Sequence, residues 1–267
     1  MKTKNLFIFS VCLAVICAAM RTATTLYTTE STTGFFIARL SSLGIFLSIA
    51  IFVLTLVAFI FAFFADKKAT TDFKLNSGSG ALSILCGIVT LLYPALFTNT
   101  SLIPWQNNLT VFFAFLSGMW FIFFGLSAFI NLKTPPVLSV VPMFYYLMRL
   151  VLVFTSFSAS ALVAEHVFSL AYRCALLVFM LMFLRICAKV PSSRTLKLFL
   201  PVSISTFILT FTSVVSRLIV HFSLGDAFIH GDVPIDYDGI ALCLAILPIT
   251  YNILKEKKEE IKNEVQC

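Results

Sequence analysis

Long runs of apolar residues, separated by short polar connections, dominate this sequence. Eight runs lie near 5–20, 38–64, 80–97, 109–130, 137–157, 165–187, 198–221 and 239–254. A helix that crosses the hydrocarbon core of a bilayer needs about 20 mostly apolar residues. Pro and Gly gather in the connections, as expected where helices end. The pattern therefore predicts an all-α polytopic transmembrane helical bundle of eight helices over 1–254, followed by a short charged cytoplasmic tail over 255–267.

Two of these segments have uncertain limits. The apolar run from 137 to 187 is too long for one crossing, so we place a turn at "TSFSAS" (155–160). The first segment has a basic start, a short apolar run and small residues at Ala18 and Ala19. A cleavable signal peptide has the same features, and its removal would leave seven helices. Both interpretations of residues 1–20 stay open at this point.

Composition agrees with a lipid environment. Of the 267 residues, 60% are hydrophobic and 12% are charged, and 30 are Phe. A soluble domain has roughly 45–50% apolar and about 25% charged residues. So few charges cannot cover a surface that faces water. The composition excludes an ordinary soluble protein and makes the lipid bilayer the first expected partner.

The charges indicate how the helices are oriented, because Lys and Arg concentrate in cytoplasmic loops. With the N-terminus inside, the alternate segments expected inside hold fourteen Lys and Arg, and those expected outside hold only Arg21 and Arg39. The other basic residues, Arg149, Arg173 and Arg217, lie within spans. We therefore expect a multi-pass protein of the plasma membrane with a cytoplasmic C-terminus. The net charge of +7 reflects this bias, and no motif points to nucleic acid.

Small residues recur on the third and fourth spans. Ser83 and Gly87 are four residues apart, as are Ala114 and Gly118, and Gly125 repeats the Gly118 face seven residues later. Such spacings let helix backbones approach closely in lipid. They predict that these two spans pack against each other through their small residues.

The seventh span carries a polar stripe at intervals of three and four residues, which share one helix face. Its members are Ser203, Thr206, Thr210 and Ser213, followed by Arg217 and His221. A polar face toward lipid is unfavourable, so the stripe should face the bundle. It could form hydrogen bonds within and between helices, or it could line a hydrated cavity.

Charged residues inside spans are rare and usually functional. At 1.5 Å per residue, Arg149 and Arg173 should lie at nearly the same depth in the outer half of the membrane. We expect a ligand-binding cluster formed by Arg149, Arg173, Arg217, Glu165, His221 and Tyr172. One interpretation is a water-filled, outward-open basic pocket for an anionic group. The other is structural, with Glu165 and a loop aspartate pairing with the arginines. Asp238 is expected to cap the last helix.

No nucleotide-binding loop, catalytic constellation or metal motif is visible, and no cofactor is indicated. The leading functional hypothesis is a non-enzymatic membrane component: a sensor, an accessory subunit or a structural partner of other membrane subunits. The first alternative is a small transporter or binder of an anionic or amphipathic solute through the arginines. The second is a membrane-embedded lipid-modifying enzyme that uses Glu165, His166, His221 or an aspartate of loop 223–239.

One region resembles a known class of proteins. Its features are Pro142, Arg149-Leu150, the small polar turn, Glu165-x-x-Phe168 and Arg185. This pattern, over roughly 135–200, is similar to one in uncharacterised multi-spanning membrane proteins of Gram-positive bacteria. The resemblance implies a shared helical bundle in a bacterial membrane and no known activity, so no functional residues are transferred from it.

Overall fold

The computed structural model describes residues 3–29, 36–65, 69–71, 73–96, 104–130, 136–155, 164–224 and 236–255. This part of the chain forms α-helices and contains no named strand, which confirms the all-α prediction. A π-helical turn, η1 (Thr24–Thr28), follows the first helix, and a 3-10 turn, η2 (Pro136–Val140), precedes the fifth. The α-helices are α1 Thr3–Ala23, α2 Ser41–Phe64, α3 Ser77–Leu96, α4 Pro104–Leu126, α5 Val141–Thr155, α6 Ala164–Cys187, α7 Ser193–Leu224 and α8 Tyr237–Lys255.

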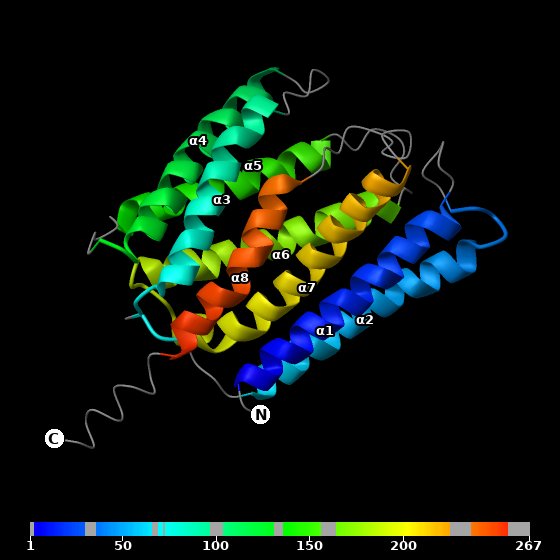
Figure 1. Cartoon of the computed structure of the whole chain (residues 1–267), viewed down its shortest axis with the longest axis horizontal. Helices are drawn as coiled ribbons and strands as arrows, with labels where there is room; N and C mark the ends of the chain where they lie inside the picture. The colour runs from blue at the N-terminus through cyan, green and yellow to red at the C-terminus, as the bar shows by residue number, and fades with distance from the viewer. Residues whose placement is uncertain are drawn as a thin grey trace.

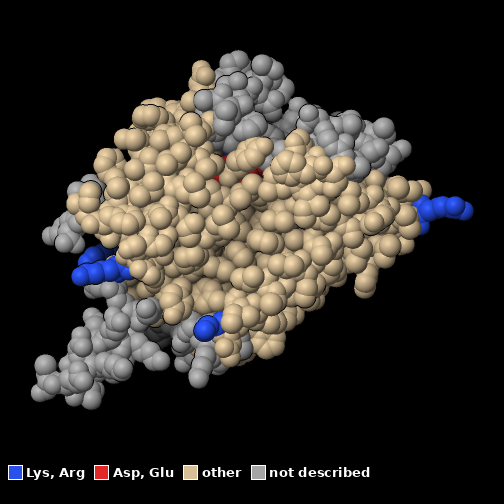
Figure 2. Space-filling view, in the orientation of Figure 1, with Lys and Arg blue, Asp and Glu red and all other residues tan. Residues whose placement is uncertain are grey.

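The helices suit a multi-pass membrane protein. Among the described residues, seven helices are long and apolar enough to cross a membrane, and α3 contributes a shorter apolar stretch over Ser77–Leu92. Large apolar side chains such as Phe46, Phe64 and Phe115 are exposed on the outside of the bundle, where lipid can solvate them. Figure 2 shows a face with almost no charge, with Lys and Arg at its margins and a small area of Asp or Glu recessed within it.

Six helices form a closed ring. Each of α3, α4, α5, α6, α7 and α8 contacts the next, and α8 closes the ring by contacting α3. The hairpin of α1 and α2 packs on the outside of α7 (Figure 1). The first turn of α1 and the last turn of α8 lie at the same end of the bundle (Figure 1). The α2–α3 connection lies at this end too, because the Thr70 hydroxyl donates to the Ile253 carbonyl at 2.9 Å.

Aromatic side chains fill the interior of the ring near that end. The rings of Trp120 and Phe124 stack at 5.0 Å between centroids, and Phe183 lies edge-on to Phe124 at 5.3 Å. Phe73, from the α2–α3 connection, lies 6.4 Å from Phe124. Because α4 and α6 are not neighbours in the ring, contacts between Trp120 and Phe183 must cross its interior. This aromatic layer, centred on Trp120, Phe124 and Phe183, closes one end of the ring.

The small residues of α3 and α4 bring the two backbones into contact, as their spacing predicts. A Cβ added at Gly87 would lie 2.6 Å from the Gly118 carbonyl oxygen, and one at Gly125 would lie 2.5 Å from the Gly80 carbonyl oxygen. No larger side chain fits such distances without moving a backbone. The glycines therefore set the separation of α3 and α4.

Each of the eight expected segments overlaps one α-helix, and the largest differences are at α4 and α7, which each begin five residues earlier than expected. We expected the seventh span to begin at 198, whereas α7 begins at Ser193 because the Ser192 hydroxyl accepts the Thr195 backbone N–H at 3.1 Å. The fourth helix begins at Pro104, five residues before the expected limit, since Pro is favoured at the first helical position. The turn expected at 155–160 lies outside the described residues after Thr155.

Arg21 is placed differently from our expectation of an outer connecting segment. The helix continues past residue 20, and the Arg21 side chain is 1% exposed. Its guanidinium carbon lies 4.2 Å from the ring centroid of Phe168 on α6. Just beyond it, the hydroxyls of Thr24 and Thr28 donate to backbone carbonyls four residues earlier. These polar side chains therefore find their hydrogen-bond partners within the helix, which continues past Arg21.

Candidate functional site

Helix periodicity places two arginines inside the ring. On α5, Tyr145 and Arg149 are four residues apart and both are buried; on α6, Tyr172 and Arg173 belong to the buried face. The two arginines lie side by side, because Nη1 of Arg173 donates to the backbone carbonyl of Arg149 at 3.4 Å. The equal depth estimated from the sequence is consistent with this contact.

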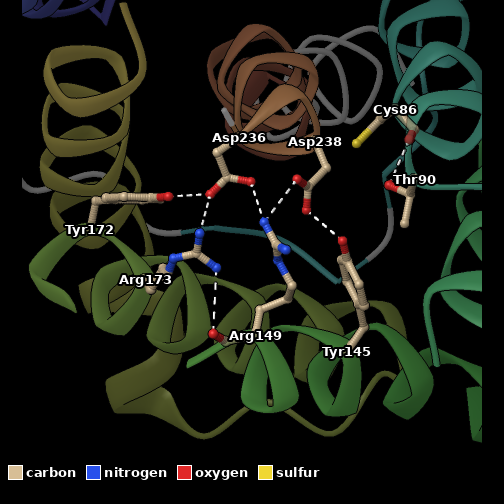
Figure 3. Close-up of polar contacts among 8 residues, drawn as sticks. All are labelled: Cys86, Thr90, Tyr145, Arg149, Tyr172, Arg173, Asp236 and Asp238. Carbon is tan, nitrogen blue, oxygen red and sulfur yellow. Dashed lines mark hydrogen bonds and ion pairs between the residues drawn. The ribbon is translucent and has the colours of Figure 1, made fainter. Parts of the chain in front are cut away.

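Two aspartates at the start of α8 meet these arginines. Asp236 accepts from Nη2 of Arg149 at 2.8 Å and lies 2.9 Å from Nη2 of Arg173. The Tyr172 hydroxyl also donates to Asp236. Figure 3 shows Asp236 between the two guanidinium groups, with Asp238 beside it. Together these contacts connect α5, α6 and α8 at the end of the ring opposite the aromatic layer.

Asp238 makes fewer hydrogen bonds and ion pairs than Asp236. Its Oδ2 accepts from the Tyr145 hydroxyl at 2.6 Å, and its Oδ1 lies 3.5 Å from Nη2 of Arg149. The same nitrogen of Arg149 therefore serves both aspartates. Both carboxyl side chains are nearly inaccessible, at 4% for Asp236 and 2% for Asp238. We call Tyr145, Arg149, Tyr172, Arg173, Asp236 and Asp238 the arginine–aspartate network.

The electrostatic environment of Asp236 favours its ionised form. Burial alone would raise the pKa of this carboxyl, but Arg173 and Arg149 hold it well below its usual range. The stabilisation that Asp236 gives is therefore complete above its unfolded-state pKa. It is lost only as the pH falls through the lower folded-state value. The network is thus built to keep Asp236 charged at neutral pH.

The structure brings together three of the six residues expected in the ligand-binding cluster: Arg149, Arg173 and Tyr172. Arg217, on α7, is partly buried and lies within electrostatic range of Tyr172. His221 follows one turn later and contacts Phe222, with ring centroids 5.7 Å apart. The side chain of Glu165 lies outside the described residues.

The polar stripe of α7 faces the inside of the bundle, where all four of its hydroxyl residues are buried. Thr206 donates to the Ala175 carbonyl of α6 at 3.1 Å, which links the two helices. Ser203 instead donates to the Phe199 carbonyl of its own helix at 2.6 Å. The buried hydroxyls of Thr210 and Ser213 have no hydrogen-bond partner among the described residues. The stripe combines both kinds of bonding expected from its spacing.

Asp236, Asp238 and Tyr145 were not among the six residues of the expected ligand-binding cluster, although the structural interpretation expected a loop aspartate to pair with the arginines. Asp238 does not cap the last helix as expected, because α8 begins at Tyr237 and Asp236 occupies the capping position. The Asp236 carbonyl accepts the Ile240 backbone N–H at 3.1 Å. Asp238 therefore lies in the first turn and points to Tyr145. The available signal was a pair of acids, two residues apart, directly before an apolar run. That run begins on the side of the membrane toward which the arginines lie.

The network pairs the charges of its carboxylates and guanidinium groups. In the part of the chain that the structure describes, no three His, Cys, Asp or Glu side chains lie close enough to hold a metal ion.

No protein-family model, curated protein or solved structure matches this chain. The chemistry of the site is therefore inferred from its own geometry.

Proposed function

We propose that this chain is a non-enzymatic membrane component, in which the arginine–aspartate network fastens α5, α6 and α8 together. One observation carries the proposal: Arg149 and Arg173 both lie within 3 Å of a carboxylate oxygen of Asp236. Buried arginines that already face carboxylates have less positive charge to offer an incoming anion. This arrangement favours the structural interpretation of the arginines. An accessory or sensory role beside other membrane subunits fits a bundle without catalytic machinery in its described residues.

On the resemblance of 135–200, we place the protein in the plasma membrane of a bacterium, with the C-terminus in the cytoplasm. The exposed basic residues support this orientation. Lys4, Lys74, Arg185, Lys189, Arg194 and Lys197 lie on α1 or at the α2–α3 and α6–α7 connections. At the other end, Arg39 is the exposed basic residue of the described α1–α2 connection. An excess of Lys and Arg marks the cytoplasmic side.

Reporter fusions test this orientation. Fusions after Lys74 and after Lys197 should place the reporter in the cytoplasm, and a fusion after Arg39 should place it outside. Activities of alkaline phosphatase and green fluorescent protein at each point measure the side, since the first is active outside and the second fluoresces inside. Opposite sides for Lys74 and Lys197 would contradict the proposal.

A transporter or binder of an anionic or amphipathic solute is the second candidate, and the ring favours it in one respect. The network lies at one end of the ring and the aromatic layer closes the other. Ionisable side chains inside a membrane helical bundle commonly mark substrate pathways. Arg217, which is only partly buried, is the arginine best placed to reach a solute.

Anion titrations separate these two candidates. Inorganic phosphate, sulfate and acetate are added to the purified protein, and its melting temperature Tm is followed at constant ionic strength. A bound anion would raise Tm with a saturable dependence on concentration. We expect no saturable rise, as the fastening role requires. A saturable rise that Arg217→Gln abolishes would instead establish the anion site.

A further inference from the structure

The two aspartates of the network are bonded unequally. Asp236 has two arginine nitrogens within 3 Å and the hydroxyl of Tyr172. Asp238 has one arginine nitrogen at 3.5 Å, which already serves Asp236, and the hydroxyl of Tyr145. The Oδ1 of Asp238 accepts no hydrogen bond from the described residues. Asp236 is therefore well stabilised as an anion, whereas Asp238 is not.

The carboxylates of Asp236 and Asp238 share one cation, because Oδ1 of each approaches Nη2 of Arg149, at 2.8 and 3.5 Å. Ionised carboxylates only accept hydrogen bonds, so a hydrogen bond between the two groups requires a proton on one of them. Two buried carboxylates beside the same guanidinium nitrogen repel each other strongly when both are charged. Because Asp236 has the stronger cation contacts, the proton belongs on Asp238.

The neighbours of Asp238 on the other helices provide little positive charge. From α3, the buried thiol of Cys86 points toward Asp238 (Figure 3). From α5, the hydroxyl of Tyr146 is buried, has no hydrogen-bond partner among the residues that the structure describes, and lies within electrostatic range of both aspartates. The titratable and charged groups around the pair are Cys86 on α3, Tyr145, Tyr146 and Arg149 on α5, Tyr172 and Arg173 on α6, and, beside Tyr172, Arg217 on α7.

We propose that Asp236 and Asp238 form a proton-binding pair, in which Asp238 takes up one proton and donates it as a hydrogen bond to Asp236. The proton comes from water and forms an O–H bond on Asp238; no other bond forms or breaks. Its uptake removes one negative charge beside Arg149 and leaves the contact with Asp236 as the ion pair of that arginine within the network. This inference goes beyond the fastening role, because it makes the contact between α8 and α5 respond to pH.

Infrared difference spectroscopy tests the proposal on the full-length protein in lipid nanodiscs. At neutral pH the wild type should show the C=O stretch of a protonated carboxyl group, and the band should disappear at alkaline pH. Asp238→Asn should lack this band. A wild type without the band, or an Asp238→Asn protein that keeps it, would overturn the proposal.

Thermal stability at neutral pH gives a second measurement. An amide has the shape of a neutral carboxyl group, donates to Asp236 and accepts from Tyr145. Asp238→Asn should therefore fold and keep a Tm near that of the wild type, while Asp236→Asn should lose most of its stability. Equal losses for the two variants, or failure of Asp238→Asn to fold, would show that Asp238 acts as a charged partner of Arg149 and would contradict the proposal.

Discussion

Asp236→Asn should destabilise the protein by about 3–5 kcal/mol, the usual cost of removing one partner from a buried ion pair. Among the carboxylates that the structure describes, Asp236 lies closest to both Arg149 and Arg173, at 2.8 and 2.9 Å. An amide in its place has no charge to offset the two guanidinium groups, whose side chains are 8% and 4% exposed. Reversible unfolding of the purified protein, or its steady-state abundance in membranes, measures the loss.

Tyr172→Phe is the matched control for this prediction. It removes one hydroxyl donor to Asp236 and leaves both arginine contacts in place. A hydrogen bond to a charged group contributes about 1.5–3 kcal/mol, so the control should be less destabilised than Asp236→Asn. If Asp236→Asn proved as stable as Tyr172→Phe, the arginines would not depend on Asp236 and the fastening role would fail.

Neutralising an arginine together with Asp236 tests the cause of the loss. The single variant Asp236→Asn removes the carboxylate that faces Arg149 and Arg173. The double variant Asp236→Asn with Arg173→Gln also removes one of these two cations. Part of the lost stability should return, because one buried charge has gone with its partner. Additive losses from the two changes would indicate damage to packing instead of an electrostatic effect.

The sequence predicted the helices well, because length, hydrophobicity and breakers are local properties. Errors arose where local polarity was misleading. Arg21 seemed to end the first helix, yet threonine hydroxyls beyond it bond back to the helix and the side chain is buried. The start of α7 was missed because its first basic residues were assigned to the preceding connection. Ser192 caps the helix before these residues.

The site was predicted only in part, for a different reason. Arg149 and Arg173 stood out as charges within apolar runs, and the depth estimate placed them level. Their partner Asp236 lies 87 and 63 residues further along the chain, and one sequence gives no sign of which loop acid approaches which helix face. Asp238 was assigned to helix capping because capping is a local interaction. Its observed partner, Tyr145, lies 93 residues earlier in the chain. Pairings of this kind become visible only when the helices are packed.

The second large effect should come from the contact between α3 and α4, which local spacing did predict. Gly87→Leu should destabilise the protein by about 1–3 kcal/mol or more, as overpacking does. The first atom of the new side chain would lie 2.6 Å from the Gly118 carbonyl oxygen and 2.9 Å from the Ile122 nitrogen. Both are backbone atoms, so the helices must separate instead of a side chain rotating away. Loss of Tm in the purified protein measures the effect.

Gly78 supplies the control within the same helix. Nothing lies within 4 Å of the position that a Cβ would take there, so Gly78→Leu should leave Tm unchanged or slightly higher. The comparison separates packing from helix propensity, because both substitutions replace a glycine of α3 by the same residue. If Gly87→Leu were tolerated as well as Gly78→Leu, α3 and α4 could not be in backbone contact. In that case α3 and α4 would not pack in the ring as the structure shows, and the ring around the arginine–aspartate network would have a different shape on that side.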